Sequence, residues 1–291
     1  MGLHIRRLIA AFLCLLLPLA AFSEDKFFDA NGVRIRYVDQ GRGPAIVLIH
    51  GQGDSLDGWV DSGLLSNLAA NFRVIALDVR GHGKSGKPHD PKAYGPEMGL
   101  DAVRLLDHLG ISRSHFIGYS MGAHLVAQLL TTHADRFMTA TLGGAAGRFR
   151  FTAENAASDE QEASEREREC VSRSQIYRLA SVNAPKPDEA AIRALSDACM
   201  SNPNQDRFAL ASVVRTKKDQ VVTREQMASI KVPLLGIVGN RDAYLRDFRE
   251  LQQLRPNTKL VVIEGATHGG PTGAALRPEF VAAVREFLAA N

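Results

Sequence analysis

The chain has 291 residues, of which 45% are hydrophobic and 23% are charged, as in an ordinary soluble globular protein. This length suits one large α/β domain or a domain with a sizeable insertion. Its 35 basic and 32 acidic residues leave a formal charge of only +3. The composition therefore gives no indication of disorder, of a repeat array or of an electrostatic nucleic-acid partner.

The first residues have the pattern of a secretion signal. Arg6 and Arg7 supply a positive start, residues 8–17 form a short apolar core, and residues 21–23 read small-x-small before a cleavage point. The apolar stretch falls short of the roughly 20 residues that span a bilayer. We therefore expect a cleaved signal peptide over residues 1–23 rather than a membrane anchor. The mature protein, with 33 basic and 32 acidic residues, is expected in a bacterial periplasm or outside the cell, without stable membrane insertion.

Apolar runs and helical stretches alternate along the rest of the chain. Residues 33–38 alternate apolar and polar side chains, which is typical of an edge or antiparallel strand. Short unalternating runs, typical of strands buried on both faces, lie at 45–49, 74–77, 115–117, 139–142, 232–238 and 260–263. Helical spacing marks residues 100–109, 123–130 and 280–288. This order predicts an α/β fold with a mainly parallel sheet and helices on both faces.

One stretch interrupts this alternation. Between about Arg148 and Met227 the sequence has no convincing buried strand. We interpret residues 148–227 as a helical cap over one end of the sheet, and residues 24–147 and 228–291 as the core. The charged run at 165–169 is interpreted as a solvated helix face with local ion pairs.

Two cysteines follow the expected signal peptide, Cys170 and Cys199. In an oxidising compartment, two thiols on neighbouring helices can pair. We favour a disulfide between them; the alternative is two independent buried cysteines.

The strongest chemical signal is the run Gly118 to Gly122, which reads GYSMG. It follows the expected strand ending at Ile117 and precedes the expected helix from Ala123, which is the context of a nucleophile elbow. A tight strand-to-helix turn needs small residues two before and two after the nucleophile. It raises the hydroxyl of Ser120 above the sheet and directs the helix N-terminus at the reacting carbonyl.

With these motifs the chain resembles the α/β-hydrolase superfamily over nearly its whole expected mature length. Residues 50–53 read HGQG after the apolar strand at 45–49. The resemblance implies that the backbone N–H groups of Gln52 and Met121 form an oxyanion hole. It also implies that His50 shapes this loop rather than transferring protons.

Residues 78–85 read DVRGHGKS and match the turn that follows the next strand in this family. The GKS triplet suggests a phosphate-binding loop, but that motif needs a glycine where Asp78 stands. We therefore reject nucleotide binding, and we interpret Asp78 and His82 as structural parts of a turn near the site.

A nucleophilic serine needs a base, and the base needs an acid to orient it. The family order of nucleophile, acid and histidine is met by Asp242, after the strand ending at Val238, and by His268, after the strand ending at Ile263. Both follow the carboxyl ends of strands, on the same edge of the sheet as Ser120. Asp247 is the weaker alternative for the acid, and His124 is interpreted as structural.

The sequence therefore predicts a serine hydrolase that cleaves a small carboxylic ester or lactone through an acyl-serine intermediate. A serine at the elbow argues against epoxide hydrolases and haloalkane dehalogenases, which resemble this chain elsewhere but use a carboxylate. The same residues serve carbon–carbon bond hydrolases and cofactor-free haloperoxidases, and a small-ligand receptor with this fold is a further alternative. The sequence has no HExxH helix, paired CxxC or dinucleotide fingerprint, so we expect no metal and no cofactor.

Overall fold

The computed structural model describes residues 24–180 and 185–291. The signal peptide expected over residues 1–23 lies outside the described residues. Within the described ranges, no helix combines the length and the apolar character that a bilayer span requires.

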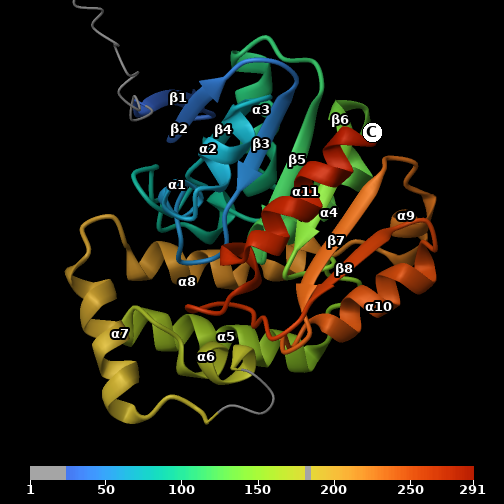
Figure 1. Ribbon diagram of the computed structural model, residues 1–291. Coiled ribbons are helices and arrows are strands. Elements are labelled where there is room, and N and C mark those ends of the chain that lie inside the picture. Colours follow the sequence, from blue (N-terminus) through green and yellow to red (C-terminus); the bar gives the residue numbers. More distant parts are fainter. Residues whose placement is uncertain (1–23, 181–184) are drawn as a thin grey trace, which may run out of the picture.

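The described strands form one sheet in the order β1-β2-β4-β3-β5-β6-β7-β8 (Figure 1). They are β1 (Lys26–Ala30), β2 (Val33–Gly41), β3 (Ala45–Ile49), β4 (Arg73–Leu77), β5 (Ser114–Tyr119), β6 (Phe137–Gly143), β7 (Leu234–Gly239) and β8 (Lys259–Ile263). β1 pairs antiparallel with β2, and β2 antiparallel with β4, whereas all further pairs are parallel. The predicted mainly parallel sheet is therefore confirmed.

Helices cover both faces of this sheet. One face carries α3 (Pro96–His108), α4 (Met121–Thr132), α9 (Arg224–Ser229) and α10 (Leu245–Leu254). The other carries α1 (Asp57–Asp61), α2 (Leu64–Ala69) and α11 (Pro278–Ala289). Short 3₁₀ turns lie at Pro91–Ala93, Ala134–Arg136, Lys217–Gln220 and Ala274–Leu276.

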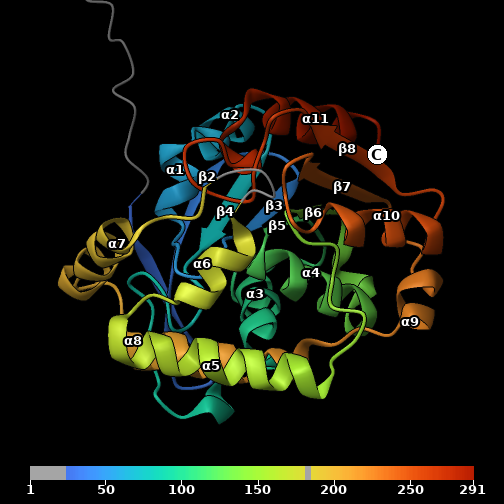
Figure 2. The same ribbon diagram turned by 90° about the horizontal axis from the view of Figure 1, so that it is seen from below.

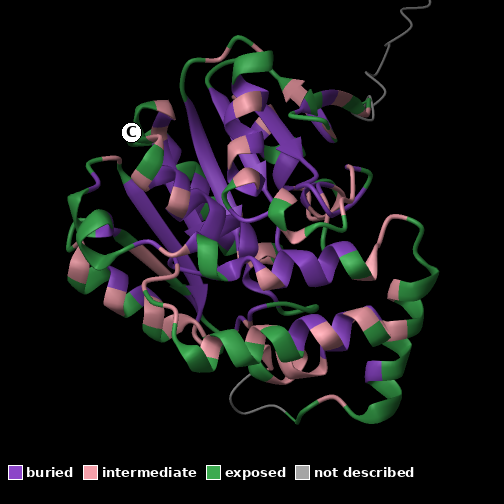
Figure 3. Cartoon of the chain, turned by 180° about the vertical axis from the view of Figure 1, so that it is seen from behind, coloured by how far each residue is buried: buried purple, intermediate pink, exposed green. Residues whose placement is uncertain are grey.

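Because helices cover both faces of the sheet, the central strands are apolar at successive positions instead of alternating apolar and polar residues. In β3, Val47 and Ile49 pack on the α3–α4 face, while Ile46 and Leu48 pack on the α2–α11 face. All four are fully buried, and Figure 3 shows the central strands as a continuous buried layer. Each such side chain contributes about 1.5–3 kcal/mol by leaving water. The central strands are therefore apolar on both sides.

Of the described helices between β6 and β7, the four that precede α9 form a group of their own. They are α5 (Ala153–Glu169), α6 (Arg173–Leu179), α7 (Glu189–Ser201) and α8 (Arg207–Arg215), here called the inserted helices. Figures 1 and 2 show them together beyond the carboxyl ends of the parallel strands, with α5 alongside α8. Ala163 of α5 packs in a small buried cluster with Ala211 and Val214 of α8.

The charged run at 165–169 is not a solvated face, contrary to the sequence interpretation. Glu165 and Arg166 are 8% and 5% exposed. The Glu165 carboxylate accepts hydrogen bonds from the hydroxyls of Ser172 and Ser174, both at 2.8 Å. Of the run, only Arg168 is exposed. Charge density alone could not show this, because the polar groups that satisfy these side chains come from other elements.

Candidate active site

The turn between β5 and α4 holds Ser120 in a strained conformation. Its φ of 52° and ψ of −111° are rare for a residue with a side chain. A Cβ at Gly118 would lie 2.3 Å from the Gly122 carbonyl oxygen, and one at Gly122 would lie 2.1 Å from the Ile49 carbonyl oxygen. Both positions must therefore be glycine for this turn to form.

Three side chains meet at this turn. His268 Nε2 lies 2.9 Å from Ser120 Oγ, and His268 Nδ1 lies 2.9 Å from Asp242 Oδ2. Asp242 follows β7 and His268 follows β8, so adjacent parallel strands deliver both residues to one edge of the sheet. An ionised carboxylate only accepts hydrogen bonds, so Nδ1 donates to Asp242 and Nε2 can accept the serine proton.

Further contacts hold the histidine and the acid in place. The Tyr119 hydroxyl donates a 2.6 Å hydrogen bond to the backbone carbonyl of His268. Burial, and then the charge of Asp242, raise the pKa of Tyr119, so its hydroxyl stays protonated as a donor. The second oxygen of Asp242 accepts the Tyr244 backbone N–H at 2.9 Å. Asp247, the weaker alternative for the acid, lies on α10 and makes no hydrogen bond with His268.

Gln52 and Met121 line the same cavity as Ser120. Met121 is the first residue of α4, so its N–H has no acceptor within the helix. His50 holds the loop that carries Gln52. Its Nδ1 lies 2.7 Å from the Gly51 carbonyl oxygen, and its Nε2 accepts the Val79 N–H at 3.0 Å. With both ring nitrogens engaged, His50 shapes the loop.

The turn at residues 78–85 is built around a buried carboxylate. Asp78 accepts the N–H groups of Leu56 and Lys84, both at 2.7 Å. A Cβ at Gly83 would lie 2.1 Å from Asp78 Oδ2, so this glycine serves the turn and not a phosphate. Burial, and then His50, lower the pKa of His82 to about 3, so its ring is neutral.

Above Ser120 lies a cavity of about 310 Å³. Its walls include three side chains that the sequence did not single out for this role: Arg148, Arg178 and Tyr244. His124 lines it as well, one helical turn after the serine, although the sequence suggested only a structural place. Arg148 follows the end of β6 as Asp242 follows β7, and that position is the only sequence signal that could have marked it.

A buried ionic cluster joins α5 and α6 to the 3₁₀ turn Lys217–Gln220 beside this cavity. Glu162 is only 1% exposed. Its Oε2 accepts a hydrogen bond from Arg178 at 2.9 Å and another from Lys217 at 2.8 Å. Arg166 lies 3.7 Å from its other oxygen. Three cations therefore surround this one buried acid.

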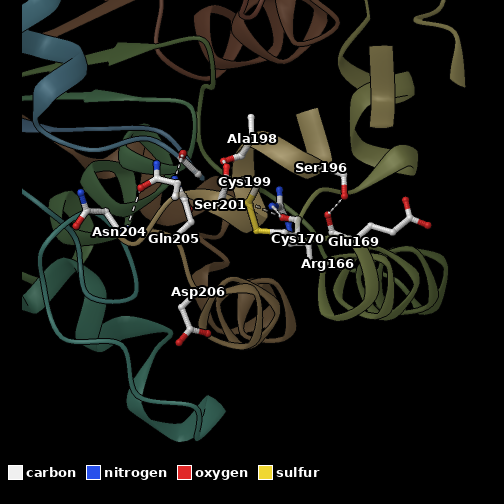
Figure 4. The surroundings of a disulfide bond; sticks show 12 residues. Arg166, Glu169, Cys170, Ser196, Ala198, Cys199, Ser201, Asn204, Gln205 and Asp206 are labelled. Carbon is white, nitrogen blue, oxygen red and sulfur yellow. Dashed lines mark hydrogen bonds between the residues drawn. A yellow bond between two sulfur atoms is a disulfide. The ribbon is translucent and has the colours of Figure 1, made fainter. Parts of the chain in front are cut away.

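Cys170 and Cys199 form a disulfide that joins the C-terminal end of α5 to α7 (Figure 4). Their Cα atoms are 5.9 Å apart, within the usual range for a disulfide. Ser196 of α7 also donates a 2.6 Å hydrogen bond to the Glu169 carbonyl oxygen. The two helices are therefore tied together at this end.

Comparison with known proteins identifies the family. Residues 44–271 match the family described as alpha/beta hydrolase fold, which is more than half of the chain. The chain therefore belongs to the α/β-hydrolase superfamily, and the fold predicted from the sequence is confirmed.

Individual relatives differ in their activities. A 2-hydroxymuconate semialdehyde hydrolase of a Pseudomonas species is 35% identical over 120 residues, 40% of this chain and 42% of that protein. Epoxide hydrolase A of Mycobacterium tuberculosis is 35% identical over 116 residues, 38% of this chain and 35% of that protein. The structure of an enol-lactonase from Burkholderia xenovorans aligns with a TM-score of 0.68 and 25% identity, over 91% of this chain and all of that one. The matched segments span 19% to 42% of the first curated relatives.

Proposed function

We propose that this protein is a serine hydrolase that cleaves a carboxylic ester or lactone of a small molecule through an acyl-serine intermediate. The observation that carries the proposal is the chain of two 2.9 Å contacts from Ser120 through His268 to Asp242. In that arrangement a serine hydroxyl has a base to accept its proton, and the base has a buried acid to orient it.

In the proposed reaction, Ser120 Oγ attacks the ester carbonyl while its proton passes to His268 Nε2. Asp242 stabilises the imidazolium that forms. The N–H groups of Gln52 and Met121 bind the negative oxygen of the tetrahedral intermediate, and losing one such donor typically costs about 100- to 1000-fold in rate. His268 then protonates the leaving alcohol. A water molecule, deprotonated by the same nitrogen, hydrolyses the acyl-serine.

The proposal is tested by Ser120→Ala. The variant should lose turnover of small p-nitrophenyl esters and lactones, and it should lose labelling by a fluorophosphonate, because both need the Ser120 oxygen. Ser66→Ala, at an exposed serine, is the matched control and should retain both. Undiminished turnover in Ser120→Ala would refute the mechanism.

Carbon–carbon bond hydrolysis is the second candidate, and the similarity to the 2-hydroxymuconate semialdehyde hydrolase favours it. Cofactor-free perhydrolysis uses the same residues. Turnover of a vinylogous 1,5-diketone acid, but not of esters, would favour carbon–carbon cleavage. Peracid formation with acetate and hydrogen peroxide would favour perhydrolysis. A non-catalytic receptor should fail to react with the fluorophosphonate. We do not propose epoxide hydrolysis, because the elbow carries a serine.

We also propose that the inserted helices act as a cap that forms the roof of the substrate cavity, and that the protein is secreted to the periplasm or outside the cell. Gln175 and Arg178 of α6 and Asp159 of α5 line the cavity, which supports the first proposal. The disulfide supports the second, because such bonds persist in oxidising compartments. Fractionation of the producing cell, with N-terminal sequencing of the mature protein, tests the location.

A further inference from the structure

The cavity above Ser120 has more positive than negative side chains on its walls. The cations are Arg148, Arg150, Arg178, Lys217 and Arg246, and the anions are Asp159, Asp247 and Glu250. A cavity for a purely apolar ester needs none of these charges. The excess of cations indicates that part of the ligand is negatively charged.

Most of these cations have acidic partners. Arg178 and Lys217 share the buried carboxylate of Glu162. Lys217 also contacts Asp159 at 3.1 Å. Arg246 lies 3.8 Å from Asp247, and its side chain is 84% exposed. Arg150 has no acidic partner within 4.0 Å among the described residues, but it is exposed to solvent. These four cations are therefore balanced or solvated without a ligand.

Arg148 is different. Among the described residues, it has no carboxylate within 4.0 Å and no hydrogen-bond acceptor for its guanidinium group, and its Nε is buried. A buried donor without an acceptor is unfavourable, so we expect a ligand in the cavity to supply an acceptor for the Arg148 guanidinium. The backbone at Arg148 is held by the Val222 N–H, which donates to its carbonyl at 2.9 Å, and by the bridge to Val221. The backbone that carries Arg148 is therefore held in place at the cavity wall.

His124 lies near both Arg148 and the nucleophile. Its backbone N–H donates to the Ser120 carbonyl at 3.2 Å, and its buried Nδ1 has no partner among the described residues. Burial, followed by the charges of Arg148 and Lys217, lowers its pKa well below the ordinary value. The ring is therefore neutral, and it lines the same cavity as Arg148 and Ser120 without adding charge.

We propose that the cavity takes substrates that carry a carboxylate, which is bound by the Arg148 guanidinium while the scissile carbonyl lies at Ser120. This deepens the proposed function and rests on it. The planar guanidinium matches a carboxylate with two parallel hydrogen bonds. A monoanion fits better than a phosphate dianion. Three carboxylates share the walls, and among the described lining residues Arg148 is the one half-buried cation without an acidic partner.

The test compares monomethyl esters of dicarboxylic acids, from malonate to adipate, with the neutral dimethyl esters. For at least one chain length, the wild-type KM for the half-ester should be about 10- to 100-fold lower than that for the diester. Arg148→Gln should abolish this preference, mainly by raising KM for the half-ester. Arg148→Lys keeps the positive charge but loses the pair of parallel hydrogen bonds that a guanidinium can donate. Its preference for the half-ester should therefore be intermediate. Arg168→Gln removes the same charge from an exposed site on α5 and should retain the preference.

Calorimetric binding to Ser120→Ala separates the two proposals. This variant should bind the half-ester more tightly than the diester, and Ser120→Ala/Arg148→Gln should not. Half-ester binding without wild-type turnover or fluorophosphonate labelling would refute the proposed function and leave the carboxylate site standing. Two outcomes would overturn the carboxylate site without affecting the proposed hydrolase activity. One is hydrolysis of half-esters and diesters with equal KM, and the other is an unchanged preference for the half-ester in folded Arg148→Gln.

Discussion

The side chains of Gln52 and Glu162 meet although they are 110 residues apart. The Gln52 amide Nε2 donates to Glu162 Oε1 at 3.4 Å, and the Gln52 Oε1 accepts the Gln175 amide at 3.3 Å. Gln52 belongs to the loop that we propose as part of the oxyanion hole, whereas Glu162 and Gln175 belong to α5 and α6. The inserted helices therefore contact the loop that carries Gln52 directly, in addition to lining the cavity.

Glu162→Gln is expected to destabilise the protein by about 3 kcal/mol, because Lys217, Arg166 and Arg178 would lose their shared buried anion. Urea unfolding at neutral pH measures this change. Glu167→Gln removes an acid of the same helix that pairs with Arg215 at the surface, and it should cost less than about 1 kcal/mol. Equal losses in the two variants would contradict the central role of Glu162.

The stability contributed by Glu162 should depend on pH. Burial raises the pKa of Glu162, but the charges of Lys217, Arg166 and Arg178 outweigh it and hold the pKa below its ordinary value of 4.5. The contribution is therefore fully present above pH 4.5 and is lost as the pH falls through the lower pKa of the folded state. The difference in unfolding free energy between wild type and Glu162→Gln should shrink as the pH is lowered below about 4.5. A constant difference across that range would contradict the assignment.

Asp242→Asn should lower kcat by about 10³- to 10⁴-fold with little loss of stability. The amide would donate toward His268 Nδ1, so Nε2 would carry the proton and could not accept one from Ser120. Steady-state kinetics on a small ester measures the effect. Asp247→Asn should lower kcat less than about tenfold, since Asp247 makes no hydrogen bond with the histidine. If Asp247→Asn proves the more damaging change, the acid is wrongly assigned.

Tyr119→Phe should lower kcat about tenfold with KM nearly unchanged, because the 2.6 Å hydrogen bond to the His268 carbonyl holds the loop that carries the base. Tyr94→Phe is its control, because that hydroxyl donates to the Pro88 carbonyl and not to the segment that carries His268. Both variants should lose about 1 kcal/mol of stability. A kcat that falls equally in both would mean that Tyr119 acts only through the fold.

The double variant Cys170→Ala/Cys199→Ala should be less stable by about 3 kcal/mol, because the cross-link spans 29 residues and restricts the unfolded chain. Thermal unfolding with and without dithiothreitol measures this. The reductant should lower the Tm of the wild type and leave that of the double variant unchanged. Both thiols reacting with an alkylating agent in the native protein without reductant would contradict the bond.

The apolar runs predicted the central strands well, because a strand buried on both faces needs apolar residues at every position. The run at 45–49 coincides with β3, and that at 74–77 lies within β4. The sequence did not single out β1, where only Phe28 and Ala30 of five residues are buried. It also missed α8, whose apolar face is set by its packing against α5 and the core. An edge strand and an inserted helix take their identity from their neighbours rather than from a strong local pattern.

By itself, the sequence determined the fold class and the order of Ser120, Asp242 and His268 along the strand ends. It could do so because a tight turn demands glycines at fixed spacing and because parallel strands end at one edge of the sheet. Only the tertiary structure decided that the three side chains lie 2.9 Å apart in succession, that Glu162 is a buried anion, and that Arg148 has no acidic partner among the described residues. Those properties depend on groups that are distant in the sequence but surround a charge in the fold. The local spacing of residues along the chain does not predict which groups these are.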